Sequence, residues 1–562
     1  MEATVSRKTG SVHPRPQLQR ETWMDLNGKW DFAVQAEGQV PEGFDRTILV
    51  PYCPESKLSG IHTHFPEGSY LFYRRLVRLP EAARGHRILL HVGAADQELT
   101  CYVNGVEIGS HSGGYTAFTM EITSAAKEEN EILLRVRDDL TDSAFPRGKQ
   151  SLTPGGMWYT PVSGIWQSVW LEWVPQTYIQ GLDIQTDTTG AVLDTGDPSL
   201  SGTVAVITPE GMVELPLTGG RAVFRPERPR LWSPEDPFLY ELSITAGDDR
   251  VSGYFALRSL EIRTVDGIPR LCLNGKPRFF HGLLDQGYWP DGIYTPDSPD
   301  RFREEILAMK RMGFNTLRKH IKVEPEEFYY QCDKLGMFVF QDMVSNGDYS
   351  YLKDTVLPTL GFQRKNDRRA HPDSRGRRMF LCSMKAQVLQ LKNHPCIAMW
   401  TIFNEGWGQF DATAAYHALK AIDSSRFICS FSGWFRGGES DVFSRHIYFG
   451  QWHHLKRTKK PLVLTEFGGI CLAVEGHLFR PKKSYGYQNS KNTADYRQKL
   501  MTLYRKHILP AIPKGLCAAI YTQVSDVEEE INGLLTYDRQ VTKPDNEEMR
   551  ILAEDLSAAM QG

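Results

Sequence analysis

Hydrophobic and polar positions change in short runs over the first half of the chain, as in β-strands. Residues 87–92 and 98–103 are two such runs, and turn residues separate them from their neighbours. Asn104-Gly105 follows the second run and is typical of a tight two-residue hairpin. Because many short strands occur here without helical patterns, residues 1–175 predict a β jelly roll and residues 176–258 an immunoglobulin-like sandwich.

After residue 259 strand-like runs alternate with helical patterns. Phe302, Ile306, Met309 and Met312 recur at helical spacing and predict one helix. The expected strands cover residues 279–284, 314–318, 337–341, 397–403, 427–431, 442–448, 462–467 and 515–521. The expected helices cover residues 301–312, 326–335, 379–391, 411–422 and 493–507. Eight strands in alternation with helices predict a (β/α)₈ TIM barrel over residues 259–562.

Composition limits the classes of partner. The net charge of −3 gives no support to a nucleic-acid partner or to an anionic membrane partner. The nine cysteines include no Cys-x-x-Cys pair, so neither a zinc site nor a disulfide framework is expected. Residues 1–8 hold no apolar segment, and no run approaches the length of a membrane span. We therefore expect a cytoplasmic protein without a signal peptide.

Two apolar strands end in a glutamate. The run from Ile397 to Phe403 leads into Asn404-Glu405-Gly406, and the run from Pro461 to Thr465 leads into Glu466. Both patterns are typical of buried parallel strands that carry a carboxylate at the C-terminal end. Such a glutamate can also cap a helix or form a surface salt bridge, but paired carboxylates on one scaffold are what glycosidic bond cleavage needs.

Other polar residues fall at the same ends of the expected strands, where a barrel enzyme places its site. They are Asp285, Arg318, His320, Asp342, Trp434, His446 and Tyr448. Asp285 and Asp342 could bind sugar hydroxyls or cap helices. Trp289, Trp407 and Trp434 are possible stacking platforms for a sugar ring, and each could equally be part of the core.

Several motifs resemble glycoside hydrolase family 2, which contains β-galactosidases, β-glucuronidases and β-mannosidases. Residues 23–32, 103–116 and 158–170 resemble the family's sugar-binding jelly roll, and residues 231–237 the end of its linking sandwich. Residues 393–395 together with Asn404-Glu405 resemble its acid/base signature, and residues 465–469 its nucleophile signature. The motifs follow the family order over nearly the whole chain.

The resemblance implies a retaining exo-β-glycosidase. Glu405 would act first as general acid and then as general base, while Glu466 would form a covalent glycosyl-enzyme intermediate. Asn404 would bind the sugar 2-hydroxyl, and Tyr448 would orient Glu466. A carbohydrate substrate is the implied partner. No organic cofactor is implied, and the sequence holds no metal-ligand cluster beyond the catalytic acids.

Departures from the family pattern bear on the sugar. Arg318 matches the family, but the histidine after it has moved to position 320. Glu530 and Asn532 stand where β-glucuronidases carry an Asn-x-Lys pair that holds the sugar carboxylate. Because a glutamate there would repel an anionic sugar, we expect a neutral galactoside first. Lys319 and Lys322 are solvated surface residues by default, but they could supply positive charge, which keeps a β-galacturonidase or β-glucuronidase open.

Three questions stay open at this point. A carbohydrate-binding protein without catalysis, or a transglycosylase with the same covalent intermediate, would share much of this pattern. Residues 343–378 interrupt the third strand–helix step with a long charged segment, which could be a solvated loop, an oligomer contact or a lid. A homo-oligomer is possible.

Overall fold

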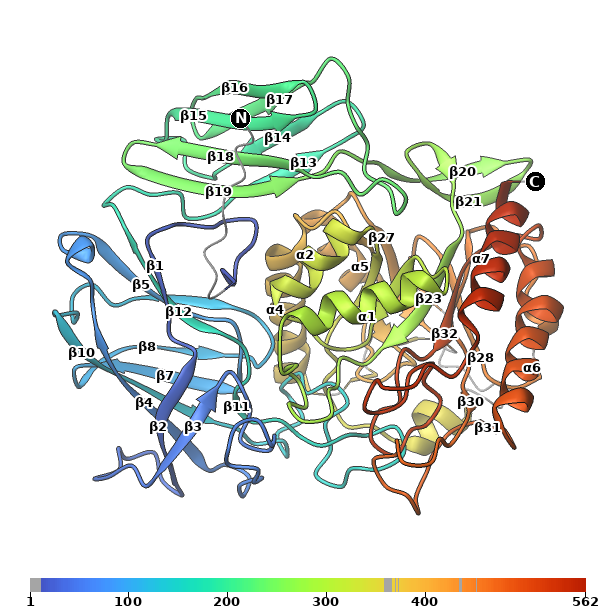
Figure 1. Ribbon diagram of the computed structural model, residues 1–562, viewed down its shortest axis with the longest axis horizontal. Coiled ribbons are helices and arrows are strands. Elements are labelled where there is room, and N and C mark those ends of the chain that lie inside the picture. Colours follow the sequence, from blue (N-terminus) through green and yellow to red (C-terminus); the bar gives the residue numbers. More distant parts are fainter. Residues whose placement is uncertain are drawn as a thin grey trace.

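The computed structural model describes residues 12–357, 366–368, 370–371, 373–433, 437–450 and 452–561. Figure 1 shows three domains: a blue jelly roll, a green sandwich and a larger domain that runs from yellow-green to red. The jelly roll lies beside the large domain, and the sandwich lies over both. This is the predicted order of folds.

Two antiparallel sheets build the jelly roll. One has the order β1-β12-β5-β9 and the other β3-β2-β4-β10-β7-β8. Asn104 and Gly105 have φ angles of 52° and 79° and join β7 to β8, as the hairpin prediction required. The elements are β1 (Trp23–Asp25), β2 (Gly28–Gln35), β3 (Arg46–Val50), β4 (Tyr70–Arg78), η1 (Glu81–Ala83), β5 (Arg87–Val92), β6 (Ala95–Asp96), β7 (Glu98–Val103), β8 (Val106–Ser112), β9 (Phe118–Glu121), β10 (Glu129–Arg137), β11 (Gly164–Ile165) and β12 (Val169–Val174).

The sandwich packs a sheet of order β13-β14-β17 against one of order β16-β15-β18-β19. Phe224, Tyr240 and Phe255 form the aromatic centre of its core, with ring centroids 5.3–5.5 Å apart. Its strands are β13 (Asp183–Thr186), β14 (Ala191–Asp194), β15 (Gly202–Thr208), β16 (Gly211–Leu217), β17 (Arg221–Phe224), β18 (Tyr240–Ala246) and β19 (Asp249–Phe255). A small sheet of β20 (Leu260–Val265), β21 (Ile268–Leu273) and β22 (Lys276–Pro277) leads into the barrel.

Eight parallel strands form the barrel in the order β27-β26-β25-β24-β23-β32-β29-β28. They are β23 (Phe280–Asp285), β24 (Thr316–Lys319), β25 (Phe338–Asp342), β26 (Ile397–Asn404), β27 (Phe427–Ser432), β28 (Phe443–Ile447), β29 (Leu462–Gly468) and β32 (Leu516–Thr522). The described backbone has no ladder between β27 and β28, so the barrel has a seam there. β30 (Ile470–Cys471) and β31 (Gln488–Asn489) pair outside the barrel.

Helices cover the barrel less regularly than the sequence pattern predicts. The α-helices are α1 (Asp300–Arg311), α2 (Glu326–Leu335), α4 (Ser374–Leu391), α5 (Ala412–Ile422), α6 (Thr493–Leu503) and α7 (Asn546–Gln561). Shorter turns are η2 (Tyr351–Val356), η3 (Trp452–His454), η4 (Tyr504–Ile508) and η5 (Leu509–Ala511). Between β28 and β29 the described residues form only the single turn η3. Strict alternation of strand and helix was therefore wrong at this step, where residues 448–461 are too rich in polar and breaking residues to form an amphipathic helix.

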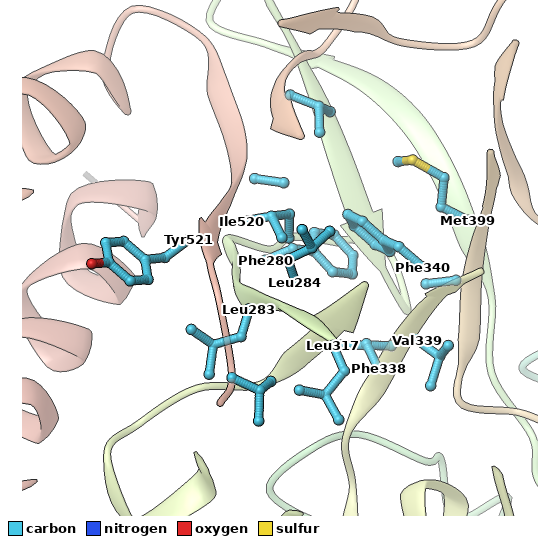
Figure 2. Close-up of a cluster of buried hydrophobic side chains, with 14 of the residues drawn as sticks. Phe280, Leu283, Leu284, Leu317, Phe338, Val339, Phe340, Met399, Ile520 and Tyr521 are labelled. Carbon is cyan, nitrogen blue, oxygen red and sulfur yellow. The ribbon is translucent and has the colours of Figure 1, made fainter. Parts of the chain in front are cut away.

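Large side chains fill the barrel interior below the catalytic end. Figure 2 shows Phe280, Leu284, Ile520 and Phe340 close together at the centre, whereas Tyr521 points outward. The Phe280 ring lies 4.9 Å from Phe338 and 5.4 Å from Phe340. This packed layer fills the interior below the C-terminal strand ends, so a site can form above it at those ends.

All nine cysteines are free thiols, and Cys382 alone is exposed. Of the helices in the described ranges, none combines the length and apolar character needed to cross a bilayer.

Candidate active site

Glu405 and Glu466 meet at the C-terminal end of the barrel. Glu405 directly follows β26, and Glu466 lies near the end of β29. One carboxylate oxygen from each, together with a ring nitrogen of His446, lie within 4.8 Å of one another. Glu405 has a φ of 53°, which is costly for a residue with a side chain, and its N–H donates to the Ser432 carbonyl at 2.9 Å. The backbone is thus held in a strained turn that aims the carboxylate at Glu466.

His446 on β28 lies between the two glutamates. Its Nδ1 is 2.8 Å from Glu405 Oε1 and 3.5 Å from Glu466 Oε2. On the other side of the ring, Nε2 faces the Arg318 guanidinium, which can only donate. Nε2 also lies 3.0 Å from Ser432 Oγ, whose own proton goes to Asn404 Oδ1, so the imidazole ring is held on both sides. The spacing of 2.8 Å is that of a hydrogen bond, so the nearness of these groups requires no metal ion.

Arg318 on β24 is completely buried and connects the ends of several strands. Its guanidinium donates to Asp342 Oδ1 at 3.0 Å and to Glu466 Oε1 at 2.8 Å. It also donates to Asn404 Oδ1 at 3.0 Å and to Ser432 Oγ at 2.9 Å. These partners lie on β25, β29, β26 and β27. Arg318 therefore fixes the positions of the acidic groups and of the strands that carry them.

The surroundings of Glu466 favour its ionised form. Burial opposes ionisation, but the nearby charges of His446, Arg318 and His320 outweigh it and lower the pKa of Glu466 to about 2. Tyr448 Oη adds a hydrogen bond of 2.5 Å to Glu466 Oε2. Burial beside Glu466 raises the pKa of Tyr448, so that phenol stays a donor. Glu466 is accordingly kept as an oriented carboxylate, as nucleophilic attack requires.

This lowered pKa predicts a pH dependence of stability. The folded pKa lies below the ordinary value of 4.5, so ionised Glu466 stabilises the fold above that value, and the stabilisation is lost as the pH falls toward 2. From about pH 5.5 to about pH 3 the wild type should lose more unfolding free energy than Glu466→Gln. Urea unfolding at several pH values measures this, and parallel slopes would contradict it.

The other expected residues near these acids also contact one another. His320 Nδ1 is 2.7 Å from Asp342 Oδ2, so both Asp342 oxygens have partners. Ser432 Oγ lies 2.9 Å from Asn404 Oδ1 and 3.0 Å from His446 Nε2. The structure thus brings Glu405, Glu466, Asn404, Tyr448, Arg318, His320, Asp342 and His446 into one network.

Lys319 and Lys322 do not face solvent or an open pocket; each is only 1% exposed. Lys319 Nζ donates to Asp285 Oδ2 at 2.6 Å and to Glu324 Oε1 at 2.9 Å. Lys322 Nζ donates to Glu324 and to the carbonyls of Gly287 and Tyr294. Two lysines thus balance Asp285 and Glu324, because buried charges need partners. The expectation that they supply positive charge to a sugar is corrected, and Asp285 is tied to the same cluster.

The acidic run at residues 528–530 is also engaged. Glu529 forms ion pairs with Arg480 at 2.7 Å and Lys483 at 2.9 Å. Glu530 accepts from Tyr159 Oη and from Asn532 Nδ2, and burial raises its pKa. The run therefore presents less negative charge than its sequence suggests.

Three expected aromatic residues have different outcomes. Trp434 lies outside the described residues. Trp289 is buried, and the Arg539 guanidinium carbon lies 4.9 Å from the centre of the Trp289 ring. Trp407 is buried two positions after Glu405, and its indole N–H donates to the Gly347 carbonyl at 2.9 Å. The start of the segment 343–378 therefore packs against the chain that follows Glu405.

One contribution was missed by the sequence patterns. Residues 147–160, which we call the strap, leave the jelly roll between β10 and β11 and pack on the barrel. Tyr159 of the strap reaches Glu530, and the Trp158 ring lies 5.2 Å from the Trp407 ring. Only residues 158–160 of the strap fell within a motif of the sequence analysis, and only the fold shows that the strap crosses to another domain.

The whole chain also resembles known proteins. Residues 269–556 match the family described as Glycosyl hydrolases family 2, TIM barrel domain. A β-galactosidase from Thermoanaerobacter pseudethanolicus is 26% identical over 64% of this chain, and the match spans 48% of that enzyme. A β-glucuronidase from Felis catus is 24% identical, with 84% of this chain and 81% of the relative covered. A solved β-D-glucuronidase structure from Dictyoglomus thermophilum superposes with a TM-score of 0.74 at 18% identity, over 96% of this chain and 98% of that one.

Proposed function

This chain belongs to glycosyl hydrolase family 2, and from that premise we propose that it is a retaining exo-β-glycosidase with Glu466 as nucleophile and Glu405 as acid/base. That the protein is a β-glycosidase follows from the family. The stereochemical course and the sugar are the parts that we propose.

The spacing of the carboxylates carries the proposal of retention. Oxygens of Glu405 and Glu466 lie within 4.8 Å of each other. Retaining enzymes hold their carboxyl groups about 5–5.5 Å apart, whereas inverting enzymes need about 6.5–9.5 Å to admit a water molecule. The shorter gap supports direct attack by one glutamate on the anomeric carbon.

The contacts of each glutamate support a division of roles. Glu466 is ionised and held by Arg318 and Tyr448, so its oxygen can bond to the anomeric carbon as the glycosidic bond breaks. Glu405 would give its proton to the departing oxygen and then remove a proton from the attacking water. Asn404 is fixed by Arg318 through its Oδ1, which leaves its amide N–H groups to bind a sugar hydroxyl.

Replacing Glu405 by Ala tests both the role and the retention. The turnover of a glycoside with a poor leaving group should fall by about 10²- to 10⁴-fold, because protonation is lost. With a dinitrophenyl glycoside, which needs no protonation, azide should restore turnover and yield the β-glycosyl azide. An α-glycosyl azide would contradict retention, and unchanged turnover on the poor substrate would contradict the acid/base role.

A neutral galactoside and two acidic sugars, a galacturonide and a glucuronide, stay candidates for the glycone. The sequence favoured a neutral galactoside, on the ground that residues 528–530 would repel an anion. The ion pairs of Glu529 and the raised pKa of Glu530 weaken that ground. Relatives named β-galactosidase and β-glucuronidase are both found. Initial rates on nitrophenyl β-galactoside, β-galacturonide and β-glucuronide rank these sugars directly.

The same substrates separate the rival classes. A carbohydrate-binding protein would turn over none of them, and Glu466→Gln would then behave like the wild type. A transglycosylase would transfer the sugar to an added acceptor instead of water. Products analysed with and without acceptor therefore distinguish hydrolysis from transfer.

A further inference from the structure

We propose that Lys149, on the jelly-roll strap, binds an anionic group of the substrate, so that the preferred glycone is a β-uronide. This inference rests on the proposed glycosidase function and adds to it the substrate class and the residue that selects it. Lys149 belongs neither to the barrel nor to the lysines that the sequence pattern suggested.

The backbone around Lys149 is fixed on the catalytic end of the barrel. The N–H groups of Arg147 and Gly148 donate to the Ser345 carbonyl at 3.0 and 3.3 Å, just after β25. Gly148 has a φ of +62°, and a Cβ there would lie only 2.8 Å from the Ile321 carbonyl oxygen, just after β24. Only glycine allows this approach, so the backbone next to Lys149 is held against the chain that follows β24.

The far end of the strap is anchored across the mouth of the barrel. The Tyr159 N–H donates to the Lys149 carbonyl at 3.0 Å, and the Tyr159 hydroxyl donates to Glu530 after β32. Lys149 therefore lies on a segment that is tied down on both sides of the site. The strap belongs to the teal chain that runs from the jelly roll beneath the barrel in Figure 1.

The ammonium group of Lys149 is available to a ligand. It lies 5.4 Å from the centre of the Trp158 ring, and the side chain is half-buried. Within the described part of the chain, no carboxylate forms an ion pair with it. Arg318, Lys319 and Lys322 differ in this respect, because each has a carboxylate partner within 3.0 Å. Lys149 is thus a site cation whose charge is not neutralised locally.

Its charge also acts on the site. Burial is the main cause that lowers the pKa of His320, and the charge of Lys149 adds to that lowering. Burial raises the pKa of Glu530, and the charge of Lys149 opposes that rise. The charge of His320 lowers the pKa of Glu466, and the charge of Glu466 raises the pKa of Glu530. Lys149 therefore belongs to the same electrostatic environment as the proposed nucleophile. An ammonium over an aromatic face, with no carboxylate paired to it in the described part of the chain, suits a sugar carboxylate better than a hydroxymethyl group.

A matched pair of substrates tests the proposal. Nitrophenyl β-galacturonide and β-galactoside differ only in a carboxylate against a hydroxymethyl group. We expect the wild type to prefer the galacturonide, and Lys149→Met to lower kcat/KM for it by about 10- to 100-fold, with less than about 3-fold change for the galactoside. Lys149→Arg should keep most of the preference. Lys29→Met, an exposed lysine of the same domain, is the matched control and should change neither rate.

Different results would contradict the role of Lys149 and the glycosidase function. A wild type that prefers the galactoside, or equal losses on both substrates in Lys149→Met, would overturn the role of Lys149 while the glycosidase function stands. No turnover of any sugar would overturn the proposed function. Even then, calorimetric binding of galacturonate against galactose to wild type and Lys149→Met would decide the inference, and binding of galacturonate that is unchanged by the substitution would refute it.

Discussion

Replacing Glu466 by Gln is expected to lower kcat by about 10⁴- to 10⁶-fold with the fold intact, because the amide cannot form the covalent intermediate. The substitution keeps the size of the side chain, and its oxygen can still accept from Arg318 or Tyr448. The wild type treated with a deoxyfluoro sugar that carries a good leaving group should gain one sugar mass on Glu466. Peptide mass spectrometry locates that label.

The control is Glu475→Gln, an exposed glutamate a few residues further along the same segment, which should leave kcat and labelling unchanged. If kcat of Glu466→Gln stayed within 10-fold of the wild type, Glu466 would not be the nucleophile. A 10-fold change in kcat corresponds to about 1.4 kcal/mol in barrier height. A label found on another residue would lead to the same conclusion.

Replacing Arg318 by Met is expected to destabilise the barrel by about 3–5 kcal/mol, because Asp342 and Glu466 would remain buried without their cation. Losing that positive charge should also raise the pKa of Glu466, so the acid limb of kcat/KM moves to higher pH. Scanning calorimetry measures the first effect and the pH profile of kcat/KM the second.

Two further variants sharpen this test. Arg311→Met removes an exposed arginine from α1 and should leave both the melting temperature and the pH profile unchanged. Arg318→Lys keeps the charge but cannot reach several strands at once. Its acid limb of kcat/KM should therefore stay near that of the wild type, while its melting temperature falls. If Arg318→Met melted like the wild type and kept its acid limb, the central position of Arg318 would be contradicted.

Much of the barrel could be predicted because its strands are short apolar runs that end at polar residues. Glu405, Glu466 and Arg318 all followed from that rule, together with the resemblance to a family. The local pattern could not tell that Lys319 points into the protein, because period-two reasoning places a lysine outward by default. Only the fold shows that Asp285 and Glu324 are there to neutralise it.

The strap could not be placed from sequence for a different reason. Its partners Ser345 and Glu530 are distant in the chain, and no local periodicity encodes contacts between domains. Ser432 is a simpler omission: it is the last residue of β27, and the strand-end rule would have included it. The missing helix between β28 and β29 shows the limit of counting alternating elements.

The seam between β27 and β28 has a consequence for how active protein is counted. Arg318 reaches Ser432 on one side of the seam and His446 on the other, and His446 in turn contacts both glutamates. The groups that perform catalysis are thus the ones that bridge the seam. A preparation titrated with the covalent sugar label therefore reports the fraction of molecules in which these contacts across the seam are assembled, which no measure of secondary structure provides.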